Sequence, residues 1–235
     1  MTDSHKVLKE VFGFDQFRTG QKELIDHVLN GDNVLGIMPT GGGKSVCYQL
    51  PALLMENLTL VVSPLISLMK DQVDALNLMG IPATFINSTL SQQEINQRVQ
   101  LAVDKKIKLL YVAPERLESY EFQQLLNHID IDLLAVDEAH CISQWGHDFR
   151  PSYLRMAETV HQFLQTPVII ALTATATPQV AEDIVRQLNI PDQNQIKTGF
   201  ARDNLSFQVV KDQNRDVFLL EYLKMNADQS GIIYA

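Results

Sequence analysis

The segment Pro39-Thr40-Gly41-Gly42-Gly43-Lys44-Ser45 lies between an apolar run at residues 33–38 and a second apolar segment that begins at Val46. Glycines let the backbone turn tightly and direct its N–H groups at phosphate oxygens, and the start of a helix adds its dipole. In such a loop Lys44 would reach the terminal phosphates of a nucleotide, and the hydroxyl of Ser45 would ligate Mg²⁺. The strict phosphate-loop pattern has a glycine where this chain has Met38, so a glycine-rich turn with a solvated lysine remains the alternative. We predict that ATP is bound by Thr40, Gly41, Gly42, Gly43, Lys44 and Ser45.

Short apolar runs recur along the chain, each followed by a polar or amphipathic stretch. Runs rich in Val, Ile and Leu without alternation are typical of strands buried on both faces of a parallel sheet. Strands are therefore predicted at residues 33–38, 58–63, 83–87, 108–113, 133–136 and 168–173. Helices are predicted between them, for example at residues 21–29, 91–103 (with a capping box at Ser91 and Glu94) and 178–188 (after Thr177). Strand followed by crossover helix indicates an α/β domain with a mostly parallel sheet and helices on both faces.

The pattern changes after Pro191. Residues 200–204 look like a connector, residues 207–211 like a strand and residues 217–223 like a helix, and residues 231–235 have the composition of a buried strand. A buried strand at a chain end would lack its ladder partners and the helix that follows it. We therefore expect a fragment, in which residues 1–203 form one domain and residues 204–235 form a connector and the truncated start of a second.

Two carboxylates follow the predicted strand at residues 133–136 directly, in the order Asp137-Glu138-Ala139-His140. A parallel α/β sheet presents its ligand site at the carboxyl ends of its strands. Asp137 would hold Mg²⁺, and Glu138 would orient or deprotonate the attacking water. The alternative is an acidic loop that caps a helix, but the order and placement of both motifs favour a nucleotide site.

The composition suits a globular protein, with 46% apolar residues, 20% charged residues and a net charge of −9. This acidity argues against binding to nucleic acid by bulk charge, so any such contact must be local. The chain has neither an apolar run near the roughly 20 residues of a membrane helix nor a signal-peptide pattern, and we expect a cytosolic protein without membrane association. Its two cysteines, Cys47 and Cys141, lack the spacing of a disulfide framework or a zinc cluster.

With Asp137-Glu138-Ala139-His140 in place, the chain resembles the DExH-type helicases of the second superfamily, and further motifs make it similar to the first RecA-like lobe of a bacterial RecQ helicase. This resemblance runs from about Leu8 to Ala235 and implies catalytic roles for Lys44, Asp137, Glu138 and His140. Residues 12–21 match the family's adenine-recognition motif, which implies that Phe14, Arg18 and Gln21 contact the base. An amide can donate to and accept from the adenine edge, and the other two side chains offer flat faces for stacking. Core packing is the alternative for Phe14 and Phe17.

Two more segments are similar to family motifs near the DNA and the moving lobe. Residues 61–72 match motif Ia, which would place Ser63, Pro64 and Lys70 against the phosphates of one DNA strand. Residues 171–177 match motif III, in which Thr173 and Thr175 could hydrogen-bond the acid motif through His140 and couple nucleotide state to lobe movement. An ordinary strand end before a helix is the alternative for each.

Residues 142–151 resemble the aromatic-rich loop of RecQ helicases, which links single-stranded DNA binding to ATP hydrolysis. Aromatic faces stack on any base and contribute about 1–3 kcal/mol each. The alternative is that Trp145 and Phe149 seal the core, although a loop between the acid motif and the next helix is a poor place for two large core aromatics. The resemblance implies DNA contacts by Gln144, Trp145, His147, Phe149 and Arg150.

The resemblance as a whole implies an ATP- and Mg²⁺-dependent 3′ to 5′ DNA helicase of repair and recombination, acting in the bacterial cytosol on single strands and duplex junctions. The family's motor needs a second lobe that supplies an arginine finger, which can be worth several orders of magnitude in rate. We therefore expect this chain alone to bind nucleotide weakly and to hydrolyse it slowly. Two alternatives stay open: a phosphate-loop ATPase that moves protein or another cargo, and a non-catalytic scaffold. The sequence names no protein partner.

Overall fold

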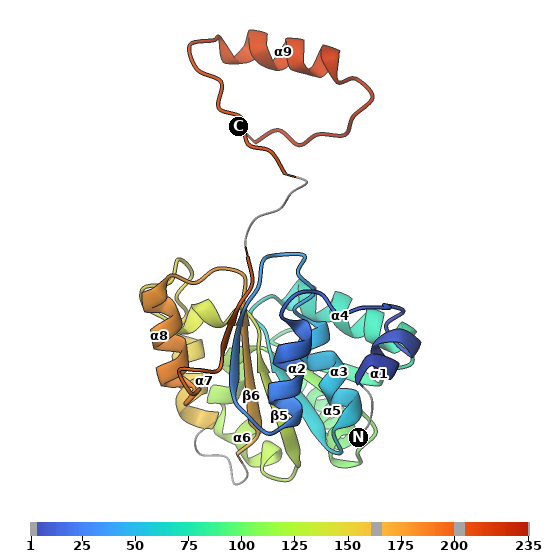
Figure 1. Ribbon diagram of the computed structural model, residues 1–235. Coiled ribbons are helices and arrows are strands. Elements are labelled where there is room, and N and C mark those ends of the chain that lie inside the picture. The colour runs from blue at the N-terminus through green and yellow to red at the C-terminus, as the bar shows by residue number, and fades with distance from the viewer. Residues whose placement is uncertain (1–3, 161–165, 200–204, 235) are drawn as a thin grey trace. The chain divides into compact units, whose positions relative to one another are not determined.

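The computed structural model describes residues 4–160, 166–199 and 205–234 (Figure 1). The chain divides into two compact units, Met1–Phe200 and Ala201–Ala235. The predicted connector at residues 200–204 lies outside the described residues. No helix in the described parts of the chain combines the length and the apolar character needed to cross a membrane.

The first unit is built on a seven-stranded sheet with the order β3-β4-β2-β5-β6-β1-β7. Each described strand pair is parallel, which confirms the predicted fold class and makes the sheet parallel throughout. Six strands lie at the predicted positions, whereas β7 was missed because it is short and only Ile196 in it is buried. The strands are β1 (Val34–Ile37), β2 (Leu58–Val62), β3 (Ala83–Ile86), β4 (Leu109–Val112), β5 (Ile131–Val136), β6 (Val168–Thr173) and β7 (Gln195–Lys197).

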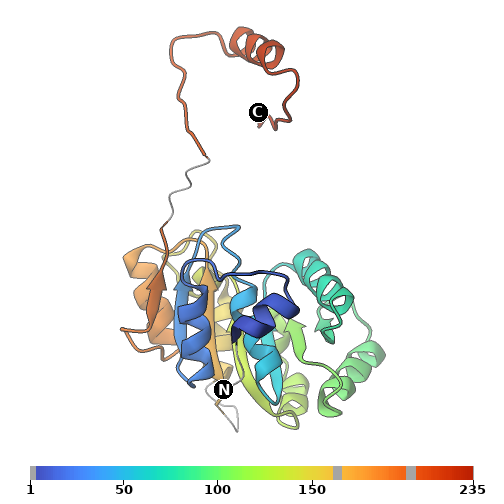
Figure 2. The same cartoon turned by 45° about the vertical axis from the view of Figure 1, so that its right-hand side comes forward.

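Helices cover both faces of this sheet (Figures 1 and 2). One layer consists of α2 (Gln21–Leu29), α3 (Val46–Leu54) and α4 (Ile66–Leu78), with α1 (Ser4–Glu10) packed against α2 and α3. The opposite layer consists of α5 (Gln92–Val103), α6 (Tyr120–Leu126), α7 (Pro151–Val160) and α8 (Pro178–Gln187). Two short 3-10 helices, η1 (Pro114–Glu118) and η2 (Ala139–Ile142), follow β4 and β5. The predicted capping box at Ser91 and Glu94 and the predicted cap at Thr177 are both present.

Backbone hydrogen bonds just beyond the central strands align the carboxyl ends of neighbouring strands with one another. The N–H of Asp137 donates to the carbonyl of Val62 over 2.9 Å, and the N–H of Met38 donates to the carbonyl of Thr173 over 3.0 Å. The ends of β1, β2, β5 and β6 therefore reach the same edge of the sheet, where a parallel α/β sheet binds its ligand.

The outer edge of β3 is closed by side chains. The carbonyls of Pro82 and Ile86 accept from Lys108 and Ala113 on the β4 side, and carbonyl direction alternates along a strand, so the carbonyls of residues 83, 85 and 87 point outward. Each of these carbonyls accepts a hydrogen bond from a side chain: Ala83 from Asn77 of α4, Phe85 from Arg98 of α5, and Asn87 from Arg116 of η1. The Asn77 amide also accepts from the N–H of Ala83, and the Arg98 guanidinium lies 4.3 Å from the centroid of the Phe85 ring.

The second unit contains one described helix, α9 (Arg215–Met225), which begins at the cap Asn214 and includes the predicted helix at residues 217–223. The strands predicted at residues 207–211 and 231–235 are wrong for the described residues, which have no regular structure there. A strand needs a neighbour that accepts its hydrogen bonds, and no described segment pairs with these two. Their apolar side chains are exposed, with Phe207 at 95% and Tyr234 at 91%.

Gly36 in the middle of β1 allows α2 to approach the sheet. A Cβ atom at this position would lie 2.7 Å from Leu172 and 2.8 Å from Leu24, both fully buried. We expect Gly36→Ala to lower the free energy of unfolding by about 1–3 kcal/mol through overpacking, as measured by urea denaturation. The control is Gly199→Ala, because nothing lies within 4 Å of the added Cβ there. That variant should be neutral or slightly stabilised, and equal losses in the two variants would contradict the explanation.

Candidate active site

The glycine-rich loop connects the end of β1 to the start of α3 and has a backbone that requires glycine. Gly41 and Gly43 have φ angles of 79° and 78°, in the left-handed region that glycine adopts without steric cost. A Cβ atom on Gly43 would also lie 2.5 Å from Nε2 of Gln21. The loop ends at Ser45, which is the N-cap residue of α3, so its N–H groups and the start of the helix lie together as an anion site requires.

Two residues of the predicted adenine-recognition segment brace this loop. Gln21 is buried; its Nε2 donates to the carbonyl of Gly43 over 2.9 Å, and its Oε1 accepts from the N–H of Arg18 over 2.8 Å. The Arg18 guanidinium donates to the carbonyl of Gly41. Phe14 is 47% exposed. The structure thus places Arg18 and Gln21 against the loop and leaves the ring of Phe14 accessible, while contact with adenine stays a prediction.

The two carboxylates of the acid motif lie at the same edge of the sheet, directly after β5. Burial, and then the neighbouring Glu138 carboxylate, raises the pKa of Asp137 to about 6. The N–H of Glu138, 3.0 Å from Asp137 Oδ1, and the Lys44 ammonium act in the opposite direction on this pKa. Lys44 also helps to hold the pKa of Glu138 below its usual value, after hydrogen bonding to His140. The cation of the loop and both acids therefore act on one another within one site.

Ser45 and Asp137 form a donor set that fits Mg²⁺. Both lie close to Tyr48: the N–H of Tyr48 donates to the carbonyl of Ser45 over 3.3 Å, and the Asp137 charge adds to the effect of burial in raising the pKa of Tyr48. A hydroxyl and a carboxylate are the hard oxygen ligands that Mg²⁺ prefers. A buried carboxylate with a raised pKa also lacks a full counter-charge, which a divalent cation would supply.

His140 connects the acid motif to the end of β6. Its Nδ1 lies 2.9 Å from Thr173 Oγ1 and 3.3 Å from Glu138 Oε2. The Thr173 hydroxyl donates to the carbonyl of Thr175 over 3.1 Å, so His140 is the donor to Thr173. The hydrogen bond predicted between the acid motif and residues 171–177 is therefore present.

The aromatic loop that follows η2 exposes its tryptophan. Trp145 is 67% exposed, which rules out the core-sealing alternative for this residue, whereas Phe149 is partly buried. The exposed His147 stacks on His140 with ring centroids 4.5 Å apart and an interplanar angle of 15°. Trp145 and both histidines line a pocket of about 330 Å³ together with Gly146 and residues Thr175, Ala176, Thr177 and Val180. Gln144 lies exposed beside Trp145.

Hydrogen bonds fix the base of this loop to two neighbouring segments. The Ser143 hydroxyl donates to Asp183 Oδ2 of α8 over 2.7 Å. Arg150 donates to the carbonyl of Pro64 over 3.3 Å, which joins the loop to the predicted motif Ia. In that segment Ser63 is buried with 3% exposure, whereas Lys70 on α4 is exposed. Two residues of this segment that were predicted to contact a DNA strand therefore differ: Lys70 is exposed to solvent, whereas the Ser63 side chain is not.

Two groups near the site were missed in the sequence. The Tyr153 hydroxyl donates to the carbonyl of Asp137 over 2.8 Å, a contact across the fold that no local pattern indicates. The ligating atoms of His140, Cys141 and Asp148 lie within 4.8 Å of one another. Burial raises the pKa of the Cys141 thiol to about 12, and Arg150 pairs with Asp148 over 3.0 Å. Because Asp148 is already paired with Arg150, one of the three ligands is engaged, and we assign no metal site to this group.

The raised pKa of Asp137 gives a pH-dependent prediction for stability. Since the folded pKa of about 6 exceeds the usual 3.8, the protonated acid favours the fold at low pH, and this contribution is lost as the pH rises through 6. Asp137→Asn should raise the free energy of unfolding by about 1–3 kcal/mol at pH 8 and by little at pH 4. Urea denaturation without Mg²⁺ at both pH values measures this.

Asp148→Asn is the control for this pH effect, because the pairing of Asp148 with Arg150 lowers the pKa of that carboxyl. It should bring no gain in stability at pH 8. A gain at pH 8 for Asp148→Asn and none for Asp137→Asn would show that the assigned environments are wrong.

Comparisons with known proteins agree with this geometry. The DEAD/DEAH box helicase family matches residues 18–184. ATP-dependent DNA helicase RecQ of Bacillus subtilis (strain 168) is 53% identical over 232 residues, which are 98% of this chain and 39% of that relative. ATP-dependent DNA helicase Q5 of Rattus norvegicus is 45% identical over 97% of this chain and 26% of its own length. The chain thus spans about two fifths or less of these relatives.

Solved structures share the fold of the first unit. The DNA-bound crystal structure of the DUF1998 helicase MrfA has a TM-score of 0.67 and 21% identity, and the match covers 84% of this chain and 28% of that one. A hypothetical ATP-dependent RNA helicase from Sulfolobus tokodaii has a TM-score of 0.64 and 19% identity over 84% of this chain and 57% of its own. The glycine-rich loop and the Asp137-Glu138-Ala139-His140 motif both lie inside the matched residues 18–184, and the similarity to RecQ is confirmed; the chain belongs to the DEAD/DEAH box helicase family.

Proposed function

We propose that this chain is the ATP-binding lobe of a RecQ-type, Mg²⁺-dependent DNA helicase, in which ATP hydrolysis drives movement along a single strand and duplex unwinding. One observation carries the proposal: the acid that would activate water is linked through His140 to a loop that exposes Trp145. Residues 1–203 would form the first RecA-like lobe, and residues 204–235 a connector and the start of a second.

The site residues have distinct proposed roles in hydrolysis. Lys44 and the loop N–H groups would neutralise the phosphate oxygens, and Ser45 and Asp137 would hold Mg²⁺, which when bound would supply further charge stabilisation. Glu138 orients the attacking water and takes its proton. The adenine would be held by Gln21, Arg18 and Phe14. To reach the base, Gln21 would give up its hydrogen bond to the carbonyl of Gly43.

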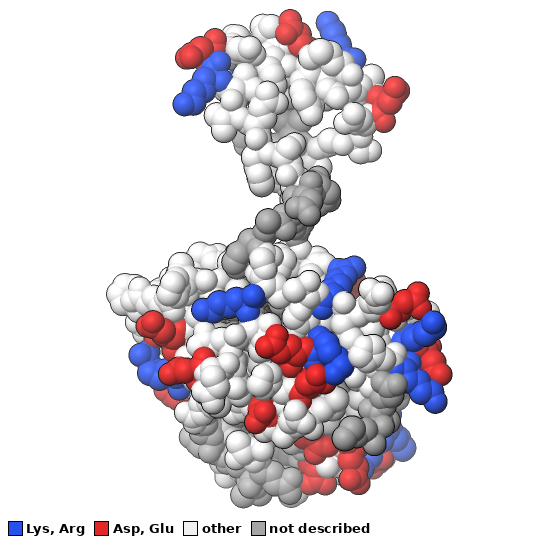
Figure 3. All heavy atoms as spheres, viewed as in Figure 1, with Lys and Arg blue, Asp and Glu red and all other residues white. Residues whose placement is uncertain are grey.

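DNA contact is proposed to be local rather than spread over the surface. The net charge is −9, and Figure 3 shows Lys and Arg interspersed with Asp and Glu over the visible face of the first unit. Stacking on Trp145 needs no basic surface, because every base has a π-face. Gln144, His147, Phe149 and Arg150 would complete the loop contact.

Further details of the proposed activity rest only on the resemblance to the RecQ family, because the names of the relatives give no more than ATP-dependent DNA helicase. These are the 3′ to 5′ direction, the role in repair and recombination, the preference for single strands and duplex junctions, and a location in the bacterial cytosol. A cargo-moving ATPase, in contrast, would show no response of hydrolysis to single-stranded DNA.

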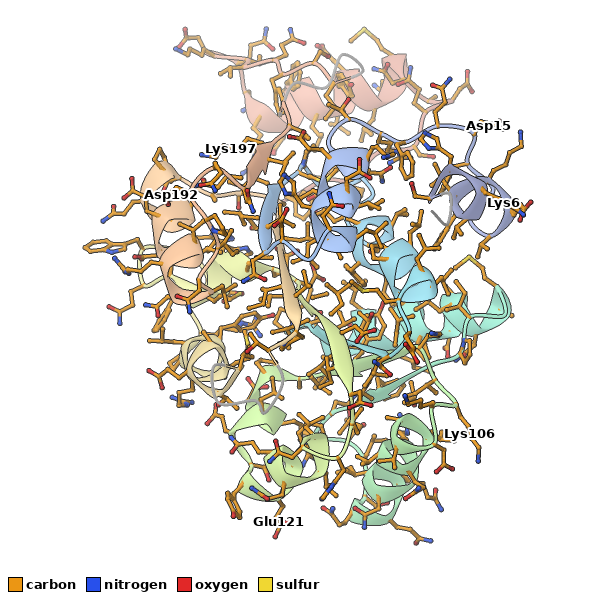
Figure 4. All side chains as sticks on the ribbon, turned by 60° about the horizontal axis from the view of Figure 1, so that its bottom comes forward. Lys6, Asp15, Lys106, Glu121, Asp192 and Lys197 are labelled. Carbon is orange, nitrogen blue, oxygen red and sulfur yellow. The ribbon has the colours of Figure 1, made fainter. Side chains whose placement is uncertain are left out.

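The nucleotide site is tested by Lys44→Ala and Glu138→Gln in the full gene product that contains this chain. Both should reduce DNA-stimulated ATP turnover by about a hundredfold or more, since each removes charge stabilisation or water activation in the transition state. Lys44→Ala should also weaken binding of a fluorescent ATP analogue, whereas Glu138→Gln should retain it. Lys106→Ala is the control, because Lys106 is exposed, pairs only with Asp104 among its described ion pairs and follows α5 (Figure 4). Turnover that survives in Glu138→Gln would refute the assigned site.

The DNA contact is tested by Trp145→Ala. Loss of one stacking platform worth about 1–3 kcal/mol should weaken binding of a single-stranded oligonucleotide about 5- to 150-fold and remove most DNA stimulation of the ATPase. Tyr120→Ala is a matched control, because Tyr120 is 72% exposed at the start of α6, outside the loop. If Trp145→Ala and Tyr120→Ala weaken oligonucleotide binding and DNA stimulation equally, the proposed DNA contact by the loop is refuted.

A further inference from the structure

A chain of polar side chains crosses the apolar layer between the sheet and helices α3 and α4. Nε2 of Gln49 donates to Gln72 Oε1 over 2.9 Å and to the Tyr111 hydroxyl over 3.2 Å. Tyr111 donates to the Tyr48 hydroxyl over 3.4 Å, and the N–H of Tyr48 donates to the carbonyl of Ser45 over 3.3 Å. Gln49, Tyr48 and Tyr111 are only 5%, 2% and 1% exposed. We refer to Tyr48, Gln49, Gln72 and Tyr111 as the polar network.

The network joins the phosphate loop to the helix of motif Ia. Ser45 is the last residue of the loop, and Tyr48 and Gln49 lie in the first part of α3, directly after it. Gln72 lies on α4, two residues after the exposed Lys70. Tyr111, on β4, fixes Tyr48 and Gln49 of α3 to the sheet, and the bond from Gln49 to Gln72 then joins α3 to α4. A displacement of the loop end therefore reaches α4 through directed contacts.

Stability alone does not account for polar groups at these positions. The surrounding layer is apolar and includes Cys47, Met69 and Val73. Burying an amide or a hydroxyl costs free energy that its hydrogen bonds only offset, so apolar side chains of the same size would pack this layer as well. What hydrogen bonds add is a fixed orientation of each helix relative to the others.

The loop at one end of the network already uses donors that a bound nucleotide would need. In this structure Lys44 Nζ donates to the carbonyl of Met38 over 3.3 Å, and the N–H of Gly42 donates to the carbonyl of Pro39 over 2.9 Å. Phosphate groups require these same donors. Nucleotide binding must therefore exchange bonds within the loop for bonds to phosphate, which changes the constraint on Ser45 and on the start of α3.

We propose that Tyr48, Gln49 and Tyr111 are positioning residues that couple nucleotide binding at the glycine-rich loop to DNA binding along α4. The proposal rests on the proposed function, because it requires that the protein bind both ligands. The coupling is reciprocal, so it is measurable as the factor by which nucleotide changes the affinity for DNA.

The test uses Gln49→Leu and Tyr111→Phe in the full gene product. Each change removes hydrogen bonds with little change in volume. The dissociation constant of a labelled single-stranded oligonucleotide is measured without and with a non-hydrolysable ATP analogue. In the wild type the ratio of the two constants should lie in the range of about 5 to 150 that is typical of coupled sites. In both variants it should fall to within about twofold of 1, with the affinity for the ATP analogue in the absence of DNA unchanged. The double variant should lose no more than either single one, since all belong to one network.

The control is Thr59→Val, which also removes a buried hydroxyl from this face of the sheet. Thr59 is fully buried, two residues before the Val61 that pairs with Tyr111, and its hydroxyl has no partner among the described residues. It should keep the wild-type ratio. If Gln49→Leu does not fold, Tyr111→Phe decides the question.

The coupling role of the network is refuted if folded Tyr111→Phe or Gln49→Leu keeps the wild-type ratio of the two dissociation constants. It is also refuted if Thr59→Val loses that ratio. A wild type that neither binds the oligonucleotide nor responds to it in ATPase overturns the proposed function instead. The two failures are therefore distinguishable.

Discussion

Parallel pairing of β5 with β2 and β6 is the constraint on which the site depends. It places the carboxyl ends of these strands level with that of β1, through bonds such as Asp137 N–H to the Val62 carbonyl. Segments that are far apart in the sequence then meet at one edge: the glycine-rich loop, the acid motif and the Thr173 turn. No one of them could position a phosphate, a cation and a water alone, because each supplies only part of the donor set.

The same edge concentrates features that cost stability. Asp137 is a buried carboxylate with a pKa raised to about 6, and Glu138 has a φ of 49°, in the left-handed region that non-glycine residues seldom adopt. Such strain persists only where surrounding contacts over-determine it. Here the Tyr153 hydroxyl holds the carbonyl of Asp137, and His140 holds the carboxylate of Glu138. The rigid sheet below and these two contacts keep the acids in place for a ligand.

Much of the fold could be predicted from the sequence, because fully buried strands and glycine loops leave strong local signals. Six apolar runs correctly predicted six strands, and the loop from Pro39 to Ser45 indicated the edge of the sheet at which the candidate site lies. β7 gave no such signal because it is an edge strand with one buried side chain. The apolar residues near Phe207 gave a false signal, since composition does not supply a pairing partner. Contacts such as Tyr153 to Asp137 depend on tertiary packing, so the sequence alone could not have shown them.

The closed edge of β3 limits how this protein can associate with other chains. An exposed strand edge offers a row of unpaired N–H and C=O groups, on which a second chain can add a strand and begin aggregation. Here an incoming strand would have to displace Asn77, Arg98 and Arg116 from carbonyls that they already satisfy. It would also have to remove the guanidinium of Arg98 from the face of Phe85. Sheet growth from this side is therefore opposed before it starts, which helps a chain that is rich in apolar strands to stay dispersed at high concentration.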